Sequence, residues 1–222
     1  MPADLATLRR IPAFSALGPD DLARVAAMTV ERTLQRGEIV VLEGDRAGAL
    51  YYVREGLIKI FKTSPEGREQ VLRLIGRGNT FNEVPALDGG PNPASAAAMQ
   101  PSVVYAVGSA DLRRLIVERP NIAVGAVRAL ADALRHLVAL VEDLSFRHVT
   151  ARVARILLDQ DAAAGDPAQG ARRLTQQEMA AMAGTAREMV GRALKELEAA
   201  GAIEMRQGHA AVIDAERLRL LA

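Results

Sequence analysis

The chain has 222 residues, of which 50% are hydrophobic and 25% are charged, a composition typical of a folded globular protein. Its length allows one or two domains. It contains no cysteine, which excludes disulfides, zinc–cysteine sites, thiol catalysis and protein-held iron–sulfur clusters. The formal net charge is only +1, so any contact with nucleic acid must come from a local arrangement of side chains.

The sequence gives no indication of secretion or of a membrane span. Residues 1–10 lack the apolar segment of a signal peptide. The most apolar long stretch, Ile122–Leu144, is interrupted by Arg128, Asp132 and Arg135, which a helix inside a bilayer would have to bury. We therefore expect a cytoplasmic protein with no membrane partner.

The first half of the chain predicts short helices followed by short strands. Pro19, Asp20 and Asp21 form a helix start within residues 4–27, with proline and acidic residues in the first turn. From about residue 30 to residue 107, short β-like runs alternate with glycine turns. These runs are Ile39–Leu42, Ala49–Val53, Leu57–Phe61, Gln70–Ile75 and Val103–Val107. Many short strands at this spacing predict a small barrel or jelly roll within a chain of the α+β class.

A long helix is predicted after Pro120. Its apolar residues follow one another at intervals of 3, 4, 3, 4 and 3 residues, and they are Val127, Leu130, Leu134, Leu137, Val141 and Leu144. This is the seam of a coiled coil. One interpretation is that the helix packs only on its own barrel. The narrow spacing and the polar flanks favour the other interpretation, in which these six residues form the interface of a homodimer.

A third unit begins near His148. Val149–Leu158 predicts a short apolar helix, whereas Asp159–Arg172 is rich in Gly, Pro and Asp and predicts a loop. The expected domains are an effector-sensing β-barrel over residues 1–119, a dimerisation helix and hinge over 120–147, and a C-terminal domain over 148–222.

Two short helices joined by a tight turn follow this loop. Thr175 precedes Glu178 by three residues, which is a capping box at a helix N-terminus. That helix is expected to end at Gly184, and a second helix to run from the Thr185-Ala186 turn to about Ala200. Such a pair is the signature of a helix-turn-helix.

The second helix of the pair carries side chains suited to reading DNA. Arg187, Glu188 and Arg192 lie near its N-terminal end. They lie away from the apolar stripe of the same helix, which consists of Val190, Leu194 and Leu197. Arginine can donate two hydrogen bonds to guanine, and glutamate can accept one from cytosine. The three charged residues are therefore candidates for contact with base edges.

A β-hairpin wing is predicted after the second helix. Strand-like runs at residues 202–205 and 210–213 flank Gln207-Gly208, which is a turn sequence. We expect Arg206 in the wing to contact the DNA backbone, together with Thr175 and Thr185, which stand at the N-terminal ends of the two helices.

The order of β-barrel, long helix and winged helix-turn-helix resembles the Crp–Fnr family of bacterial transcription regulators, which includes the catabolite activator protein. The resemblance covers roughly residues 10–214, and its most specific part is G-T-A-R-E-M-V-G-R at Gly184–Arg192. It implies that Arg187, Glu188 and Arg192 contact bases of double-stranded DNA and that RNA polymerase is a partner. The family often has serine where Ala186 stands and threonine where Met189 stands, departures that bear on backbone contacts and on the preferred half-site.

The sensory half matches the family less well. The family's cyclic-nucleotide pocket reads roughly F-G-E-L and, about ten residues later, R-S or R-T. The residues of this chain at the matching positions are Phe81, Asn82, Glu83, Ala94 and Ser95. Glu83 matches the glutamate that accepts from the ribose, but the arginine that pairs with the cyclic phosphate falls on Pro93, which has neither charge nor N–H. We therefore expect no binding of cyclic AMP in the family's usual manner, and no cofactor.

Several alternatives stay open from the sequence. The effector could be a small organic ligand between barrel and long helix, a haem held by Met99, His136 or an N-terminal proline, or there could be none. A cupin metalloenzyme is excluded because residues 30–107 contain no histidine. No nucleophile–base constellation is evident, so we expect no enzyme. The rival function is a ligand-binding regulatory module whose winged domain contacts a protein.

Overall fold

The structure is a computed structural model that describes the chain except for residues 1–3, 12–13, 16, 47, 165–172 and 207. The chain divides into two compact units. The N-terminal unit comprises residues 1–61 and 73–137, and the C-terminal unit comprises residues 62–72 and 138–222. In the part of the chain that the structure describes, no helix is long and apolar enough to cross a membrane.

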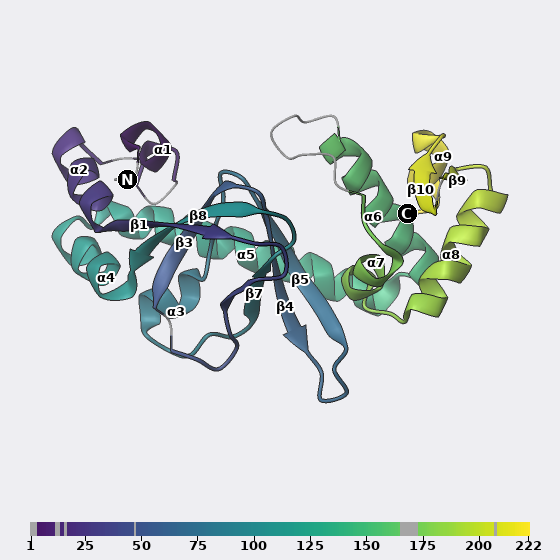
Figure 1. The fold of residues 1–222 in the computed structure, drawn as a ribbon, viewed down its shortest axis with the longest axis horizontal. Coiled ribbons are helices and arrows are strands. Elements are labelled where there is room, and N and C mark those ends of the chain that lie inside the picture. The colour runs from purple at the N-terminus through teal and green to yellow at the C-terminus, as the bar shows by residue number, and fades with distance from the viewer. Residues whose placement is uncertain (1–3, 12–13, 16, 47, 165–172, 207) are drawn as a thin grey trace. The chain divides into compact units, whose positions relative to one another are not determined.

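Two four-stranded sheets form the centre of the N-terminal fold (Figure 1). One sheet has the order β1 (Thr29–Leu34), β8 (Ser102–Gly108), β3 (Ala49–Glu55), β6 (Thr80–Phe81). The other has the order β2 (Ile39–Val41), β7 (Ser95–Ala98), β4 (Leu57–Thr63), β5 (Glu69–Gly76). β8 pairs antiparallel with both β1 and β3, and β7 pairs antiparallel with both β2 and β4. The predicted barrel or jelly roll within an α+β chain is confirmed as a β-sandwich.

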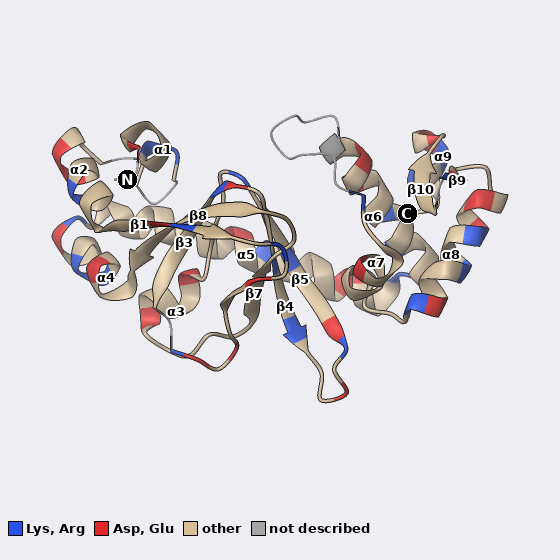
Figure 2. Ribbon diagram, in the orientation of Figure 1, with Lys and Arg blue, Asp and Glu red and all other residues tan. Residues whose placement is uncertain are grey.

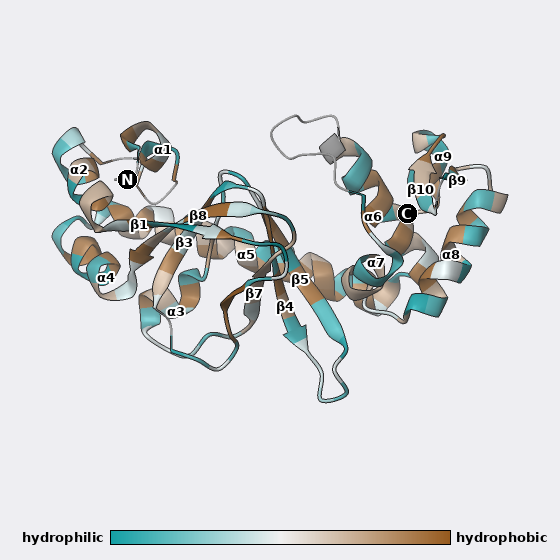
Figure 3. Cartoon of the chain, viewed as in Figure 1, coloured by the Kyte–Doolittle hydropathy of each residue, from teal (hydrophilic) through white to brown (hydrophobic). Residues whose placement is uncertain are grey.

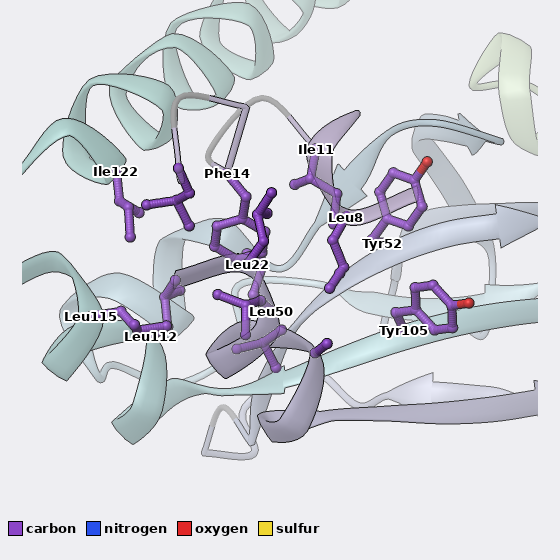
Figure 4. Packing of buried hydrophobic residues seen from close by; sticks show 14 of the residues in the cluster. Leu8, Ile11, Phe14, Leu22, Leu50, Tyr52, Tyr105, Leu112, Leu115 and Ile122 are labelled. Carbon is purple, nitrogen blue, oxygen red and sulfur yellow. The ribbon is translucent and has the colours of Figure 1, made fainter. Parts of the chain in front are cut away.

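Strand β3 is buried on both of its faces, which explains why its sequence is a continuous apolar run and not an alternating one. Tyr51 and Val53 belong to the core between the two sheets. Leu50 and Tyr52 point the other way, into a second core formed with the helices. Figure 4 shows this second core, in which Tyr52 and Tyr105 stack with ring centroids 6.3 Å apart.

Four short helices cover the second core: α1 (Leu5–Arg9), α2 (Pro19–Met28), α3 (Glu83–Asp88) and α4 (Ser109–Glu118). Figure 1 shows α1, α2 and α4 together at one end of this unit. α2 begins at Pro19 with Asp20 and Asp21 in its first turn, as the sequence predicted. Asp21 accepts a hydrogen bond of 2.7 Å from Arg119, and this guanidinium lowers the pKa of the Asp21 carboxyl.

The long helix α5 (Asn121–Phe146) begins directly after Pro120. Ile122 and Gly125 are buried against the N-terminal unit. The seam predicted from the sequence lies on a different face of the helix and stays mostly exposed: Leu134 is 63% exposed and Val141 is 62% exposed. The helix therefore has one apolar face that packs on the N-terminal unit and a second apolar face that stays mostly exposed among the described residues.

Beyond the end of α5, the described residues of the C-terminal unit form four helices and a hairpin. They are α6 (Val149–Ala164), α7 (Gln176–Ala183), α8 (Arg187–Ala199), β9 (Ile203–Arg206), β10 (His209–Val212) and α9 (Ala215–Leu220). The loop predicted over Asp159–Arg172 is wrong for residues 159–164, which continue α6. Three consecutive alanines, the strongest helix formers, extend the helix there. Residues 165–172 of that predicted loop lie outside the described residues.

Candidate nucleic-acid interface

The helix-turn-helix is fixed by local interactions at each end of α7. Thr175 caps the helix: its hydroxyl accepts from the Glu178 amide at 3.2 Å, and the Glu178 carboxylate accepts from the Thr175 amide at 2.8 Å. Gly184 ends the helix with φ +61°, a conformation that favours glycine. A Cβ at Gly184 would also lie 2.7 Å from a methyl group of Leu144. The predicted capping box and glycine end of the helix are confirmed.

Helix α8 presents charged residues on the side opposite its buried face. The buried face consists of Val190, Ala193, Leu194 and Leu197. Arg187, Glu188 and Arg192 are exposed near the N-terminal end of the same helix. Figure 2 shows charged residues spaced along the ribbon of α8, and Figure 3 shows hydrophilic residues over much of the helix. The three residues that the sequence predicted to read bases are therefore all solvent-exposed in the first two turns of α8.

The N-terminal end of α8 has no side-chain cap. Ala186 occupies the cap position in extended backbone and makes no side-chain hydrogen bond to the helix. Thr185 precedes it, with its amide donating to the Ala180 carbonyl at 3.1 Å. Backbone N–H groups at a helix N-terminus attract anions such as a DNA phosphate. By contrast, the Thr175 hydroxyl is engaged with Glu178 in the capping box.

The wing has a feature that sequence reasoning missed. Arg206 donates to the Glu204 carboxylate from both Nε, at 2.8 Å, and Nη2, at 2.6 Å. The two residues lie on the same face of β9 because side chains two apart on a strand point the same way. The wing is also held to α8, because the Glu198 carboxylate accepts from the Met205 amide at 3.0 Å. The arginine predicted to contact DNA therefore already has a carboxylate partner.

Arginines around the junction of α5 and α6 form a second network that sequence reasoning missed. Asp143 near the end of α5 accepts from Arg147 at 2.9 Å and from Arg155 on α6 at 3.2 Å. Arg152 donates to the carbonyl of Ala183, the last residue of α7, at 2.8 Å. The spacing of four residues between Asp143 and Arg147 was the available signal in the sequence, but the pairing of Asp143 with Arg155 depends on the fold.

The predicted effector residues form two groups in the sequence, and the first group consists of Phe81, Asn82 and Glu83. Phe81 is buried and stacks on Tyr51 with ring centroids 5.0 Å apart. Asn82 has φ +69° and donates to the Ala49 carbonyl at 3.0 Å. Asparagine is one of the few residues other than glycine that tolerates this conformation, so it can stand where the family has glycine. The Glu83 carboxylate accepts from the Thr80 hydroxyl at 2.5 Å.

A small pocket lies beside Glu83 in the N-terminal unit. Its lining consists of Leu50, Thr80, Glu83, Leu87, Leu112, Ala126 and Ala129. Ala94 and Ser95, the second group of predicted effector residues, do not line it. Both are buried, and the Ser95 hydroxyl accepts from the Glu43 amide at 3.0 Å. Glu83 is thus the one predicted effector residue that lines this pocket.

The structure also shows where the residues considered for binding phosphate or haem lie. Pro93 is exposed in the segment before β7. Met99 is buried, with its amide donating to the Leu57 carbonyl at 2.8 Å, and His136 is exposed on α5. Among the described residues, no group of three His, Asp or Glu side chains could hold a metal ion.

Comparison with known proteins accounts for both units. Residues 31–119 match the family model of the cyclic nucleotide-binding domain, and residues 151–221 match that of the Crp-like helix-turn-helix domain. The chain is 32% identical over 215 residues to a CRP-like cAMP-activated global transcriptional regulator of Mycobacterium tuberculosis, covering 95% of this chain and 96% of that one. It is also 32% identical to the cyclic AMP receptor protein of Thermus thermophilus, again covering 95% and 96%.

A solved structure has the same fold, but its name specifies an effector other than cyclic AMP. The c-di-GMP responsive global regulator CLP of Xanthomonas campestris superposes with a TM-score of 0.74 at 24% identity, covering 94% of this chain and 99% of that one. The chain therefore belongs to the Crp/Fnr family of transcriptional regulators, DNA-binding proteins and not enzymes, which join a cyclic nucleotide-binding domain to a Crp-type helix-turn-helix.

Proposed function

We propose that this regulator binds a palindromic DNA site as a homodimer, with α8 of each subunit in a major groove. The observation that carries the proposal is the exposure of Arg187, Glu188 and Arg192 at one end of a helix whose other face is buried. These residue types can discriminate bases in the major groove. Thr185 and the wing would contact the backbone, which makes binding steeply dependent on salt.

The exposed seam of α5 supports the homodimer. Its valines and leucines repeat at heptad spacing, so the same surface on a second copy is complementary to it. Full burial of an exposed valine or leucine contributes about 1.5–3 kcal/mol, and each seam side chain contributes in proportion to the part of it that is still exposed, 38% for Leu144 and 63% for Leu134. The two-fold symmetry then sets half-sites about 34–36 Å apart, one turn of DNA. RNA polymerase is the expected protein partner at the promoter.

Control by an effector other than cyclic AMP, or by none, fits the N-terminal unit. The names of two relatives specify cyclic AMP, and that of a protein with the same fold specifies c-di-GMP, so the fold alone does not choose an effector. Pro93 stands where the resemblance expects the phosphate-binding arginine. A cyclic phosphate would lack the charge-assisted pair that this arginine supplies, worth about 1.5–3 kcal/mol.

In this proposal each predicted domain has its own function. Residues 1–119 sense the effector, residues 120–147 form the dimer and residues 148–222 bind DNA. The switch would act at the junction near Phe146–His148. Asp143 on α5 forms an ion pair across that junction with Arg155 on α6, so a change in the angle between α5 and α6 would break this ion pair, whereas the local pair of Asp143 with Arg147 could persist. Hydrogen exchange over residues 140–150 should therefore change when a true effector binds.

The direct test is selection of binding sites from random duplex DNA by the purified protein, without ligand, at near-physiological salt. Recovery of a palindrome supports the proposal and means that the unliganded dimer is competent. If nothing is enriched, the selection is repeated with cell extract. Enrichment only with extract indicates a required effector, whereas failure in both cases favours a winged domain that contacts protein.

A further inference from the structure

One apolar side chain lies within the charged, exposed surface of α8. Met189 is 38% exposed, and it is the one large exposed hydrophobic residue of this helix, all of which the structure describes. It does not belong to the buried face formed by Val190, Ala193, Leu194 and Leu197. The two residues that precede it, Arg187 and Glu188, are both exposed. Packing within the C-terminal unit therefore leaves part of this side chain for another contact.

Met189 also contacts a residue that we assign to base reading. The Nη1 of Arg192 lies 3.9 Å from the Met189 sulfur, three residues back on the helix. Side chains three apart are neighbours on a helix surface, and a thioether sulfur is a weak hydrogen-bond acceptor. The thioether and the guanidinium thus present an apolar surface and a pair of donors side by side.

The chemistry of the major groove offers one apolar group, the 5-methyl of thymine, and arginine there pairs with O6 and N7 of guanine. An apolar side chain beside an arginine matches a thymine beside a guanine. We propose that Met189 contacts the 5-methyl group of a thymine next to the base that Arg192 reads, and so determines part of the half-site sequence. This inference rests on the proposed insertion of α8 in the major groove.

The test removes only the methyl group. Each thymine of the selected palindrome is replaced in turn by uracil in both half-sites. The affinity of the full-length protein for each duplex is measured by fluorescence anisotropy. We expect one position at which the replacement weakens binding about 4-fold per half-site, the value of one buried methyl group. In Met189→Gln the ratio at that position falls to about one, whereas Met189→Leu, which stays apolar, retains it.

Two results would overturn the inference while leaving the proposed function intact. In one, the wild-type protein prefers the palindrome over a scrambled duplex, but it binds every uracil-substituted palindrome as tightly as the unsubstituted palindrome. In the other, the thymine preference persists unchanged in Met189→Gln. A wild-type protein that does not distinguish the palindrome from the scrambled duplex would overturn the proposed function as well. Thermal unfolding of the two variants checks that an exposed substitution leaves the fold unchanged.

Discussion

The C-terminal unit presents Arg187, Glu188 and Arg192 on one exposed helix end, whereas the N-terminal unit has Pro93 where its resemblance to the family expects an arginine. Both units retain the family's fold, as the two family models and the β-sandwich show. The difference lies in side chains that a fold does not require. A fold is kept by its buried residues, while ligand chemistry depends on a few polar side chains that can change independently.

The largest expected effect comes from the α5 seam, whose residues belong partly to the N-terminal unit and partly to the C-terminal unit. Leu134→Glu places a charge in the proposed interface of two copies, so the protein should become monomeric, and affinity for the palindrome should fall by on the order of 100-fold or more because bivalent binding is lost. Sedimentation and equilibrium DNA binding measure the two effects. Ala139→Glu adds the same charge at an exposed position away from the seam and should leave the dimer intact. A dimeric Leu134→Glu protein would contradict the assigned interface.

The next effect concerns the N-terminal unit alone. Isothermal titration should detect no cyclic AMP binding by the wild-type protein, because the matching position is Pro93. Pro93→Arg should bind about 10- to 150-fold more tightly than Pro93→Ala, the range that a charge-assisted pair of about 1.5–3 kcal/mol provides. Tight binding of cyclic AMP by the wild-type chain, unchanged in both variants, would show that this unit recognises the phosphate in another way.

A smaller effect is expected at the capping box of the C-terminal unit. Thr175→Ala removes the hydroxyl that accepts from the Glu178 amide, and it should lower the free energy of unfolding by about 1 kcal/mol. Urea denaturation followed by circular dichroism measures the loss. Thr175→Ser keeps the hydroxyl and serves as the matched control. Equal losses in the two variants would mean that the methyl group and not the cap is responsible.

The smallest effect is expected in the wing. Glu204→Gln removes the carboxylate that now holds Arg206, so the arginine can pair with a phosphate. Affinity should rise a few-fold, and the slope of log affinity against log salt should steepen by about 0.9 for each additional phosphate that the protein neutralises. Measuring affinity across a salt series, with Arg206→Ala as the reference, gives both values. A slope that is the same in wild type, Glu204→Gln and Arg206→Ala would mean that Arg206 does not contact DNA.

The sequence predicted the features that depend on near neighbours. The Thr175–Glu178 capping box, the helix end at Gly184 and the helix start at Pro19 each require only a few adjacent residues. Strand β7 (Ser95–Ala98) is not among the predicted runs, because alanine has a low β propensity. Its place comes from pairing with β2 and β4 and from complete burial, which no local pattern encodes.

The candidate site shows the same limit. Arg187, Glu188 and Arg192 could be assigned to one exposed face because helical periodicity fixes where they lie relative to Val190. The carboxylate partner of Arg206 and the meeting of Asp143 with Arg155 were not predicted. Many nearby charges offer alternative pairs, and only the folded chain selects among them.

The central claim, that α8 reads base edges, is tested most directly by one set of affinities. Wild type, Arg192→Ala and Arg219→Ala are compared on the selected palindrome and on a scrambled duplex at the same salt concentration. Arg219 is an exposed arginine on α9, so its removal matches the loss of charge. We expect Arg192→Ala to lose about 1–3 kcal/mol on the palindrome, and to lose no more than Arg219→Ala on the scrambled duplex. Equal losses on both duplexes for Arg192→Ala would contradict base reading by α8.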